Sequence, residues 1–465
     1  FDLGHQCDRH QRSGLMLSVG LELQSQLPPG ASGPVPVSVP AGFGWDTASF
    51  PLAITRSGNT FSSGLTPRDL VNPAIWTGPA FHVDPAADDS NSGLGAMDGD
   101  FSDAKRTIYG AFVAGNATGA PYRIIVKAGQ YEGSALTRNG KDEPNQPVAI
   151  IAHGGRVHYR TGPFSTTWSD AGGTASASVS SVRRVFRTDI LTSEGFYTEL
   201  EQVADVATCA ATAGSWVLDG STVHVNVGGV PGAGDIALMR SFHGARFLTH
   251  TDDLYLEGLD IEGGITGALH CDPVASRNIV GVDCSFRYSA PSNPAAPQDA
   301  VRIRRNTGLA AFFGCDASVG AKDGWSFHDD GVAGMHVLLE DCTSKSNGAY
   351  GATSVNDFTL HDAVVGVSMN GQYGPSENGS DVHLIQNAQA WVMGGAVTAR
   401  DTDGISTAVK CSNASQMWLD RVQLDAAGST SNYALEVNGG TVFTRDLTIV
   451  SGTEEVTSGG SVTPF

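Results

Sequence analysis

Two short runs of the sequence repeat the same order of chemically reactive side chains. WSFHD at 325–329 and FTLHD at 358–362 both read large apolar, small polar, large apolar, His, Asp, and they start 33 residues apart. This alternation is typical of a β-strand, in which successive side chains point to opposite faces. If the two runs form neighbouring strands in register, His328 lies near His361, and the aspartates that follow them are also neighbours.

These aspartates could perform acid–base chemistry. Asp329 and Asp362 on adjacent strands would lie about 5 Å apart, which is the spacing of a retaining glycosidase pair, and each would raise the pKa of the other. Asp323, just before the first run, is a third carboxylate candidate. A lyase would instead need Ca²⁺ on acids and a basic side chain, for which Lys322 and Lys345 are available.

A reading without catalysis also fits the same residues. Asp and His at turn corners form polar ladders that satisfy backbone groups, and Asp362 shares its place in the repeat with several other aspartates. The sequence favours this ladder, and with it glycan binding rather than turnover.

Aromatic side chains in the same span could contact sugars. Exposed rings on a rigid sheet are good stacking surfaces for sugars, and the expected glycan-binding residues are Trp325, Tyr350 and Tyr373. The two tyrosines, in GAYG and GQYG, are expected in surface turns. Trp391 is expected in the core.

A repeat with a period of 21 to 32 residues provides the strands that would position these groups. The anchor positions of its short alternating runs are Asp260, Asp283, Gly314, Asp341, Asp362, Gly394, Arg421 and Asp446. Repeated short strands without intervening helices predict an all-β, right-handed parallel β-helix, whose coils stack at roughly 4.8 Å. We expect about eight coils between 254 and 450.

Three cysteines occupy the same place in this repeat. Cys284, Cys315 and Cys342 each follow an anchor position, so we expect them to point inward, unpaired, and to stack as small hydrophobic side chains. A metal or redox triad is the alternative, and no His or carboxylate shares their row.

The segment before the repeat resembles a known family. It comprises FHVDPAADDSNSG (81–93), DFSDAKRTIYGAFVAGN (100–116), YRIIVKAGQYEG (122–133) and PNQPVAIIAHGG (144–155). These runs resemble the first segment of pectate-lyase-like β-helix proteins, which implies a helix near 102–115 that caps the open end of the core. Ser102, with the nearby Asp103, is the expected N-cap. The expected apolar stripe is Ile108, Phe112 and Val113.

The acidic turn in this segment has two interpretations. Asp88, Asp89 and Asn91 are expected to form an ordinary turn, and a Ca²⁺ site is the alternative. The spacing is not that of an EF-hand loop, so turn chemistry is the favoured interpretation.

Composition limits the organisation and the partners. The 465 residues contain 58 Gly and carry a net charge of −20, which excludes nucleic acid as a partner and repels anionic membrane surfaces. The sequence contains no run of about 18 apolar residues, which is the length needed to span a membrane. We expect an N-terminal attachment segment and Pro/Gly linker at 1–41. A β-helix body is expected at 42–465, with a side excursion near 192–240.

This architecture resembles the spike and receptor-binding proteins of tailed phages and gene transfer agents. The resemblance implies a homotrimer on the virion surface that binds host surface polysaccharide, with residues 1–40 docked on a capsid or tail protein. The alternative is a secreted polysaccharide lyase or glycoside hydrolase of the pectate-lyase-like class, because one solenoid can host both functions. We expect no cofactor, unless Ca²⁺ is bound.

Overall fold

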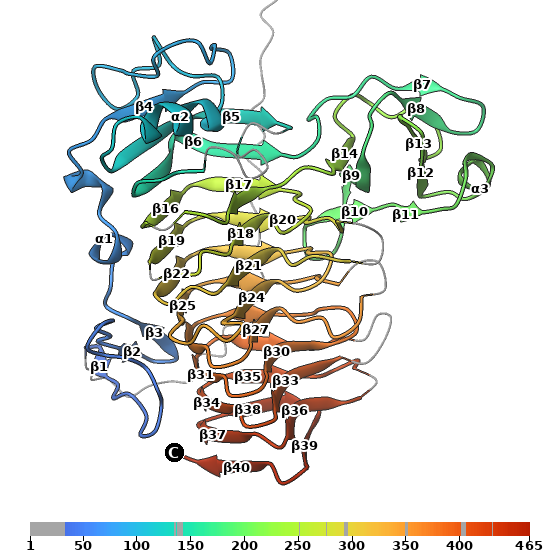
Figure 1. Ribbon diagram of the computed structural model, residues 1–465. Helices are drawn as coiled ribbons and strands as arrows, with labels where there is room; N and C mark the ends of the chain where they lie inside the picture. Colours follow the sequence, from blue (N-terminus) through green and yellow to red (C-terminus); the bar gives the residue numbers. More distant parts are fainter. Residues whose placement is uncertain are drawn as a thin grey trace, which may run out of the picture.

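The computed structural model describes residues 33–465, except for the short segments 134–135, 137–142, 251, 276, 293–295, 349–351, 401–405 and 430. The chain winds into a parallel β-helix with three sheets (Figure 1). Eight successive coils between 254 and 457 each contribute one strand to every sheet, which confirms the predicted solenoid. None of the described helices has the length and apolar character needed to cross a membrane.

Sheet I runs along the whole solenoid. Its strands are β4 (Ala80–Val83), β5 (Tyr122–Glu132), β6 (Val148–Arg160), β16 (Leu254–Glu257), β19 (Asn278–Val282), β22 (Leu309–Phe313), β25 (His336–Glu340), β28 (Val365–Met369), β31 (Gln389–Met393), β34 (Gln416–Asp420), β37 (Thr441–Arg445) and β40 (Ser461–Pro464).

Sheet II follows each strand of sheet I after a corner. It contains the second halves of β5 and β6, then β17 (Leu259–Glu262), β20 (Ser285–Arg287), β23 (Asp316–Ser318), β26 (Thr343–Ser344), β29 (Gln372–Tyr373), β32 (Ala396–Thr398), β35 (Gln423–Asp425) and β38 (Thr448–Ser451).

Sheet III completes each coil. Its strands are β15 (Ala245–Phe247), β18 (Leu269–Cys271), β21 (Val301–Arg304), β24 (Trp325–His328), β27 (Phe358–Leu360), β30 (Ser380–Leu384), β33 (Thr407–Ser412), β36 (Tyr433–Asn438) and β39 (Thr453–Thr457).

The corner between sheets I and II is a single residue in the left-handed backbone region. The corner residues, with φ between +46° and +73°, are Gly258, Asp283, Gly314, Asp341, Asn370, Gly394, Arg421 and Asp446. Glycine and Asn or Asp tolerate this region best, which explains the composition of the row. Two of the expected anchors were wrong. Asp260 lies two residues past its corner, in β17, and Asp362 lies at another corner, after β27.

The three stacked cysteines lie directly after these corners. Cys284, Cys315 and Cys342 are at most 2% exposed, unpaired, and part of the main apolar core. The backbone N–H of Cys284 faces the Sγ of Cys315 at 3.3 Å. The prediction of an inward cysteine stack is confirmed.

A helix lies beside β4 and β5 at the N-terminal end of the solenoid (Figure 1). This helix, α2 (Ile108–Asn116), buries Ile108, Ala111, Phe112 and Gly115. The N-cap is Thr107, whose side chain accepts from the Gly110 N–H, and not the expected Ser102. Val113 is 48% exposed because it lies off this i, i+3, i+4, i+7 face, so its expected place in the buried stripe was wrong.

The N-terminal residues 33–76 run along the outside of sheet I (Figure 1). They form a small antiparallel sheet, a short helix and a 3₁₀ turn: β1 (Val35–Pro36), β2 (Thr55–Ser57), β3 (Thr60–Ser62), α1 (Pro67–Leu70) and η1 (Pro73–Ile75). Phe43, Trp45 and Phe61 cover an apolar outer row that includes Trp391 and Trp418. We call residues 33–76 the N-terminal strap. The expected attachment segment lies largely outside the described residues.

A side excursion leaves the solenoid after β6 and returns at β15. It contains β7 (Ser169–Asp170), β8 (Ala175–Ala177), β9 (Val182–Leu191), β10 (Tyr197–Glu199), β11 (Glu201–Gln202), α3 (Val206–Ala211), β12 (Ser215–Asp219), β13 (Thr222–Asn226) and β14 (Ile236–Arg240). Most of it has an apolar core of its own, around Trp216 and Val223. The excursion projects from the solenoid near β17 and β20 (Figure 1).

Candidate functional site

The outward face of sheet III carries most of the expected site residues. Along β24, Trp325 and Phe327 are buried in the core, so the alternation of a strand turns Ser326 and His328 outward. The next strand, β27, pairs with β24 residue by residue. Adjacent coils therefore bring equivalent polar side chains into contact.

His328 and His361 meet on this face as the sequence predicted. Their ring centroids are 3.9 Å apart and the ring planes differ by 16°. Burial lowers the pKa of His328 to about 4 and that of His361 to about 3, the latter helped by the neighbouring His328. Both rings are therefore uncharged at neutral pH, and His328 Nε2 lies 2.9 Å from the Ser326 hydroxyl.

The carboxylates of Asp329 and Asp362 stabilise turns by accepting hydrogen bonds from backbone N–H groups. Asp329 is 2% exposed and accepts the N–H groups of Gly331 and Ala363, both at 2.9 Å. Asp362 accepts the Asp330 N–H at 2.9 Å, while its own N–H donates to the Gln386 Oε1 at 2.6 Å. These bonds form the polar ladder that the sequence favoured, rather than a pair of carboxylates that face each other.

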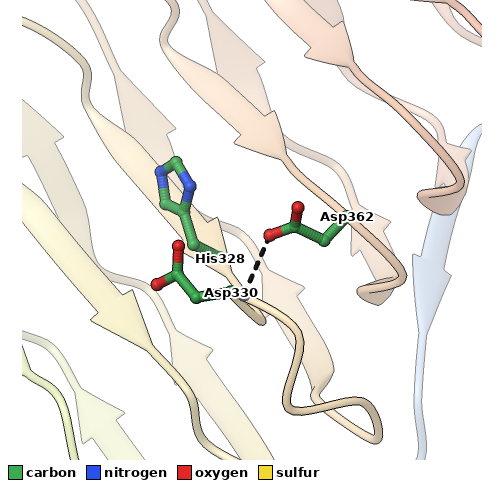
Figure 2. A group of neighbouring side chains, drawn as sticks. All are labelled: His328, Asp330 and Asp362. Atoms are coloured by element: carbon green, nitrogen blue, oxygen red, sulfur yellow. Dashed lines mark hydrogen bonds between the residues drawn. The ribbon is translucent and has the colours of Figure 1, made fainter.

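Three potential metal ligands gather beside this ladder. Ligand atoms of His328, Asp330 and Asp362 lie within 4.8 Å of one another, and Figure 2 shows the three side chains. The Asp330 carboxylate, however, already accepts from Arg304 Nε at 2.6 Å. A bound cation would have to displace or oppose this guanidinium, so the donor set fits a cation poorly.

A buried carboxyl pair lies at the edge of the same face. Asp323 and Asp299 are 1% and 4% exposed, and the Asp299 Oδ1 lies 3.4 Å from the Asp323 backbone N. Burial, and then the Asp299 charge, raise the pKa of Asp323 to about 7. Lys322 Nζ lies 3.6 Å from Asp323, whereas Lys345 follows β26, in sheet II.

The sequence reading missed Asp299, although a signal was present. DAVRI at 299–303 repeats the pattern of DGWSF at 323–327: Asp, small, apolar, polar, apolar. The pairing of β21 with β24 brings these two runs into register.

The sequence reading also missed the central outward row of sheet III. Its members, one for each successive strand, are Arg246, His270, Arg302, Ser326, Thr359, His383, Lys410, Glu436 and Glu455. Among the described residues, the two ring nitrogens of His270 and the Nε atoms of Arg246 and Arg302 are buried without a hydrogen-bond partner. A neutral imidazole offers one donor and one acceptor, and a guanidinium offers donors only, so this part of the row has hydrogen-bonding groups that the protein itself does not use.

The expected aromatic platform is not formed by the residues named for it. Trp325 is fully buried, and Tyr373 is 2% exposed with its hydroxyl 2.8 Å from that of Ser368. Both expectations of glycan stacking were wrong, because the alternation of the strand turns these large rings inward. Tyr350 lies outside the described residues. Trp391 is buried as expected, but under the N-terminal strap.

The acidic turn at 88–91 is used in local hydrogen bonds. Asp88 accepts the Ser90 N–H, Asp89 accepts both the N–H and the hydroxyl of Thr107, and the Asn91 amide donates to the Ala104 carbonyl. These bonds tie the turn to the N-terminus of α2. They account for the three residues through turn and cap chemistry, the interpretation that the sequence favoured over a Ca²⁺ site.

Comparison with known proteins yields only distant matches. No family model and no curated protein matches the chain. Solved structures similar to it include XylC in complex with xylose (12% identity, 80% of this chain and 69% of that chain, TM-score 0.41). The pectate lyase Pel9A (12%, 85% and 84%, TM-score 0.39) and the tailspike protein gp49 from Pseudomonas phage LKA1 (11%, 75% and 75%, TM-score 0.18) also match. Likeness at this level concerns the solenoid fold alone.

Proposed function

We propose that the protein binds a polysaccharide lengthwise along the outward face of sheet III. The observation that carries this proposal is the row Arg246, His270 and Arg302, in which the Nε atoms of both arginines and the two ring nitrogens of His270 are buried without a hydrogen-bond partner. The Arg302 guanidinium is held beside them by its Nη1, which donates to the Gln298 Oε1 at 3.0 Å. Sugar hydroxyl and carboxylate oxygens are acceptors that such donors need. Coils that repeat every 4.8 Å or so also present equivalent groups at regular intervals, which suits a repeating polymer.

The test is affinity electrophoresis against a panel of purified bacterial surface polysaccharides. We expect the double variant His270→Ala/Arg302→Ala to bind its polysaccharide at least 10-fold more weakly than the unaltered protein. The matched control, His153→Ala/Arg106→Ala, changes the same residue types at exposed positions outside sheet III. Equal losses in both variants, or no binding to any polysaccharide, would contradict the proposal.

Hydrolysis of the bound glycan is the second candidate function. Asp323, with a pKa of about 7, can hold a proton at neutral pH beside Asp299, and glycosidases use such a pair of carboxyl groups as acid and base. Both side chains are nearly closed to solvent, and for this reason binding comes first. If the protein is an enzyme, Asp323→Asn should lower the release of reducing ends by 10²-fold or more. An unchanged rate would exclude this role.

We further propose that the binding face belongs to a spike on the virion of a tailed phage or gene transfer agent. In this proposal residues 1–40 attach a homotrimer to the capsid or tail. Support comes from the Pro/Gly-rich sequence that begins at 28, just ahead of the strap, whose residues from 33 onward belong to the folded body. A protein that lacks residues 1–40 should fold but fail to copurify with particles. Normal incorporation of the truncated protein would contradict attachment through residues 1–40. Absence of the full-length protein from particles would favour the secreted polysaccharide lyase or hydrolase instead.

A further inference from the structure

A polar cleft lies on another side of the solenoid, between sheet II and the side excursion. Its volume is about 270 Å³. The residues that line it are Arg156, His158, Tyr197, Asp260, Glu262, Asp283, Cys284, Ser285, Arg287, Gly314 and Asp316. None of these residues belongs to the sheet III face described above.

The floor of the cleft is a row of outward side chains from successive strands. Asp260, Ser285 and Asp316 occupy equivalent positions in β17, β20 and β23. The two carboxylates are therefore separated by two coils, or roughly 10 Å between Cα atoms. The Ser285 hydroxyl donates to Asp260 at 2.5 Å.

Two arginines flank this floor and hold the acids in place. Arg156 Nε donates to Asp260 at 3.1 Å, and Arg287 Nε donates to Asp316 at 2.6 Å. Burial alone would raise the pKa of Asp260, but the hydrogen bonds from Arg156 and Ser285 lower it, so Asp260 is ionised at neutral pH.

The excursion supplies an aromatic wall that is fixed to the solenoid. Tyr197 stacks on Tyr288 with ring centroids 4.9 Å apart and planes 7° from parallel, and its hydroxyl lies 3.2 Å from the Glu262 carboxylate. The fully buried Arg184 of the excursion donates to the carbonyls of Ser289 and Val319 at 2.7 Å. The Tyr197 ring is therefore already held in position by the protein itself, which lowers the entropy cost of binding.

We propose that this cleft binds a single sugar residue that carries no negative charge. Sugar hydroxyls both donate and accept, and the cleft offers carboxylate acceptors and guanidinium donors side by side with a Tyr wall. Its lining has four carboxylates against two guanidinium groups, and a third guanidinium, that of Arg160, pairs with Glu262 at 2.6 Å. The balance remains negative, so a uronate or phosphate would be repelled. The site extends the proposed function with a second glycan contact, but it does not depend on the sheet III face.

Saturation-transfer NMR with free monosaccharides tests this site directly. The probes are glucose, galactose, N-acetylglucosamine and glucuronate. We expect at least one of the three uncharged sugars to bind, and no signal from glucuronate. Gly314→Arg should reduce the signal at least five-fold, since Gly314 lines the cleft and a Cβ added there would meet no heavy atom within 4 Å, which leaves room for the side chain to begin.

The backbone allows this substitution, and a matched control exists. Arg421 occupies the corresponding corner of a later coil with φ +57°, close to the +58° of Gly314. Gly220, in the turn between β12 and β13, has φ +60° and is equally open, so Gly220→Arg should bind the sugar normally. If Gly314→Arg fails to fold, Asp283→Gly removes an exposed carboxylate of the cleft at another left-handed corner. This second variant should weaken binding about three-fold.

Three results would overturn the proposal. They are no binding of any uncharged sugar, equal binding of glucuronate, or full binding by the folded Gly314→Arg protein. Loss of the signal in His270→Ala/Arg302→Ala together with full retention in Gly314→Arg would place the sugar on sheet III. If no polysaccharide binds but the monosaccharide still does, the result contradicts only the proposed function of sheet III.

Discussion

The imidazole rings of His328, at the end of β24, and His361, directly after β27, stack with their centroids 3.9 Å apart. Burial holds the pKa of His328 near 4 and that of His361 near 3, so two charged rings do not face each other at neutral pH. The stack therefore contributes a neutral, hydrogen-bonding surface to the proposed polysaccharide face.

This stack should make the protein less stable in mild acid. In the unfolded chain both rings take up a proton as the pH falls below about 6.5, while in the folded chain they stay neutral until pH 4 or lower. Folding stability is thus fully present above pH 6.5 and is lost as the pH falls. By pH 5 the loss should be on the order of 1–2 kcal/mol for each ring.

Denaturant unfolding between pH 4.5 and 7.5 measures this loss. We expect His328→Asn/His361→Asn to reduce the slope of the acid limb of the stability profile. The remaining slope should come from other histidines, including His243, His270 and His383, whose pKa values burial also lowers. The exposed-site control His153→Asn should leave the limb as in the unaltered protein. An acid limb of the same slope in the double variant would show that other groups cause the loss.

Asp357 and Asp381 should produce the opposite dependence at higher pH. Both carboxyl groups are fully buried, and burial raises the pKa of Asp357 to about 7 and that of Asp381 well above its usual range. The folded protein retains protons that the unfolded chain releases above pH 4. This stability is present in acid and is lost as the pH rises through 7.

Replacing one of the two carboxyl groups with an uncharged side chain should remove this loss of stability at high pH. Asp381→Asn has nearly the same shape and no charge, and it keeps an acceptor for the Ser376 N–H, which now donates to Asp381 at 2.8 Å. We expect the melting temperature to rise at pH 8, and to rise less at pH 5, which lies only about one unit above the pKa of the carboxyl group in the unfolded chain. Asp381→Ala, which leaves a cavity and no acceptor, should lower it at both values. An Asp381→Asn protein with no gain in melting temperature at pH 8 would contradict the assignment.

The N-terminal strap should be essential to the solubility of the solenoid. The Phe43 ring lies 5.2 Å from that of Trp418, and Phe61 is 1% exposed in the same apolar cluster. Phe61→Ala should destabilise the protein by about 3–5 kcal/mol. The control is Val35→Ala, at a 44% exposed site, and it should cost less than about 1 kcal/mol.

Truncations at two positions distinguish the strap from the attachment segment. Removal of residues 1–40 leaves Phe43 and the rest of the aromatic cluster in place, so the protein should remain folded and soluble by circular dichroism and gel filtration. Removal of residues 1–76 uncovers the row that contains Trp391 and Trp418 and should cause aggregation. If the longer truncation is folded and free of aggregates, the structural role of the strap is refuted.

The cysteine stack should resist chemical modification. Burial raises the pKa of Cys315 and that of Cys342, so neither thiol ionises at neutral pH, and a thiol reagent should label them only on unfolding. Cys315→Ser should cost roughly 1–3 kcal/mol because it buries a poorly paired hydroxyl. Cys315→Ala, without a hydroxyl, separates that effect from the loss of volume. Rapid labelling of the native protein would disprove the buried stack.

Much of the fold was determined by local sequence. The period of 21 to 32 residues, the alternation in runs such as WSFHD and the Gly, Asn or Asp corners all follow from backbone geometry that each coil repeats. They therefore predicted the solenoid, its coil number, the inward cysteines and the contact of His328 with His361. The local rules failed where two corners of one coil resemble each other, as at Asp362, because both prefer a residue that tolerates a positive φ.

Only the tertiary structure decided which polar groups meet and which rings are buried. Asp299 faces Asp323 because β21 and β24 pair in one particular register. The coils differ in length, so this register could not be predicted from a constant spacing in the sequence. Trp391 lies beneath the N-terminal strap because this distant segment packs against the outer face of sheet I. The cleft at Asp260 exists because the side excursion folds back over sheet II, and such a contact between residues far apart in the chain leaves no periodic trace in the sequence.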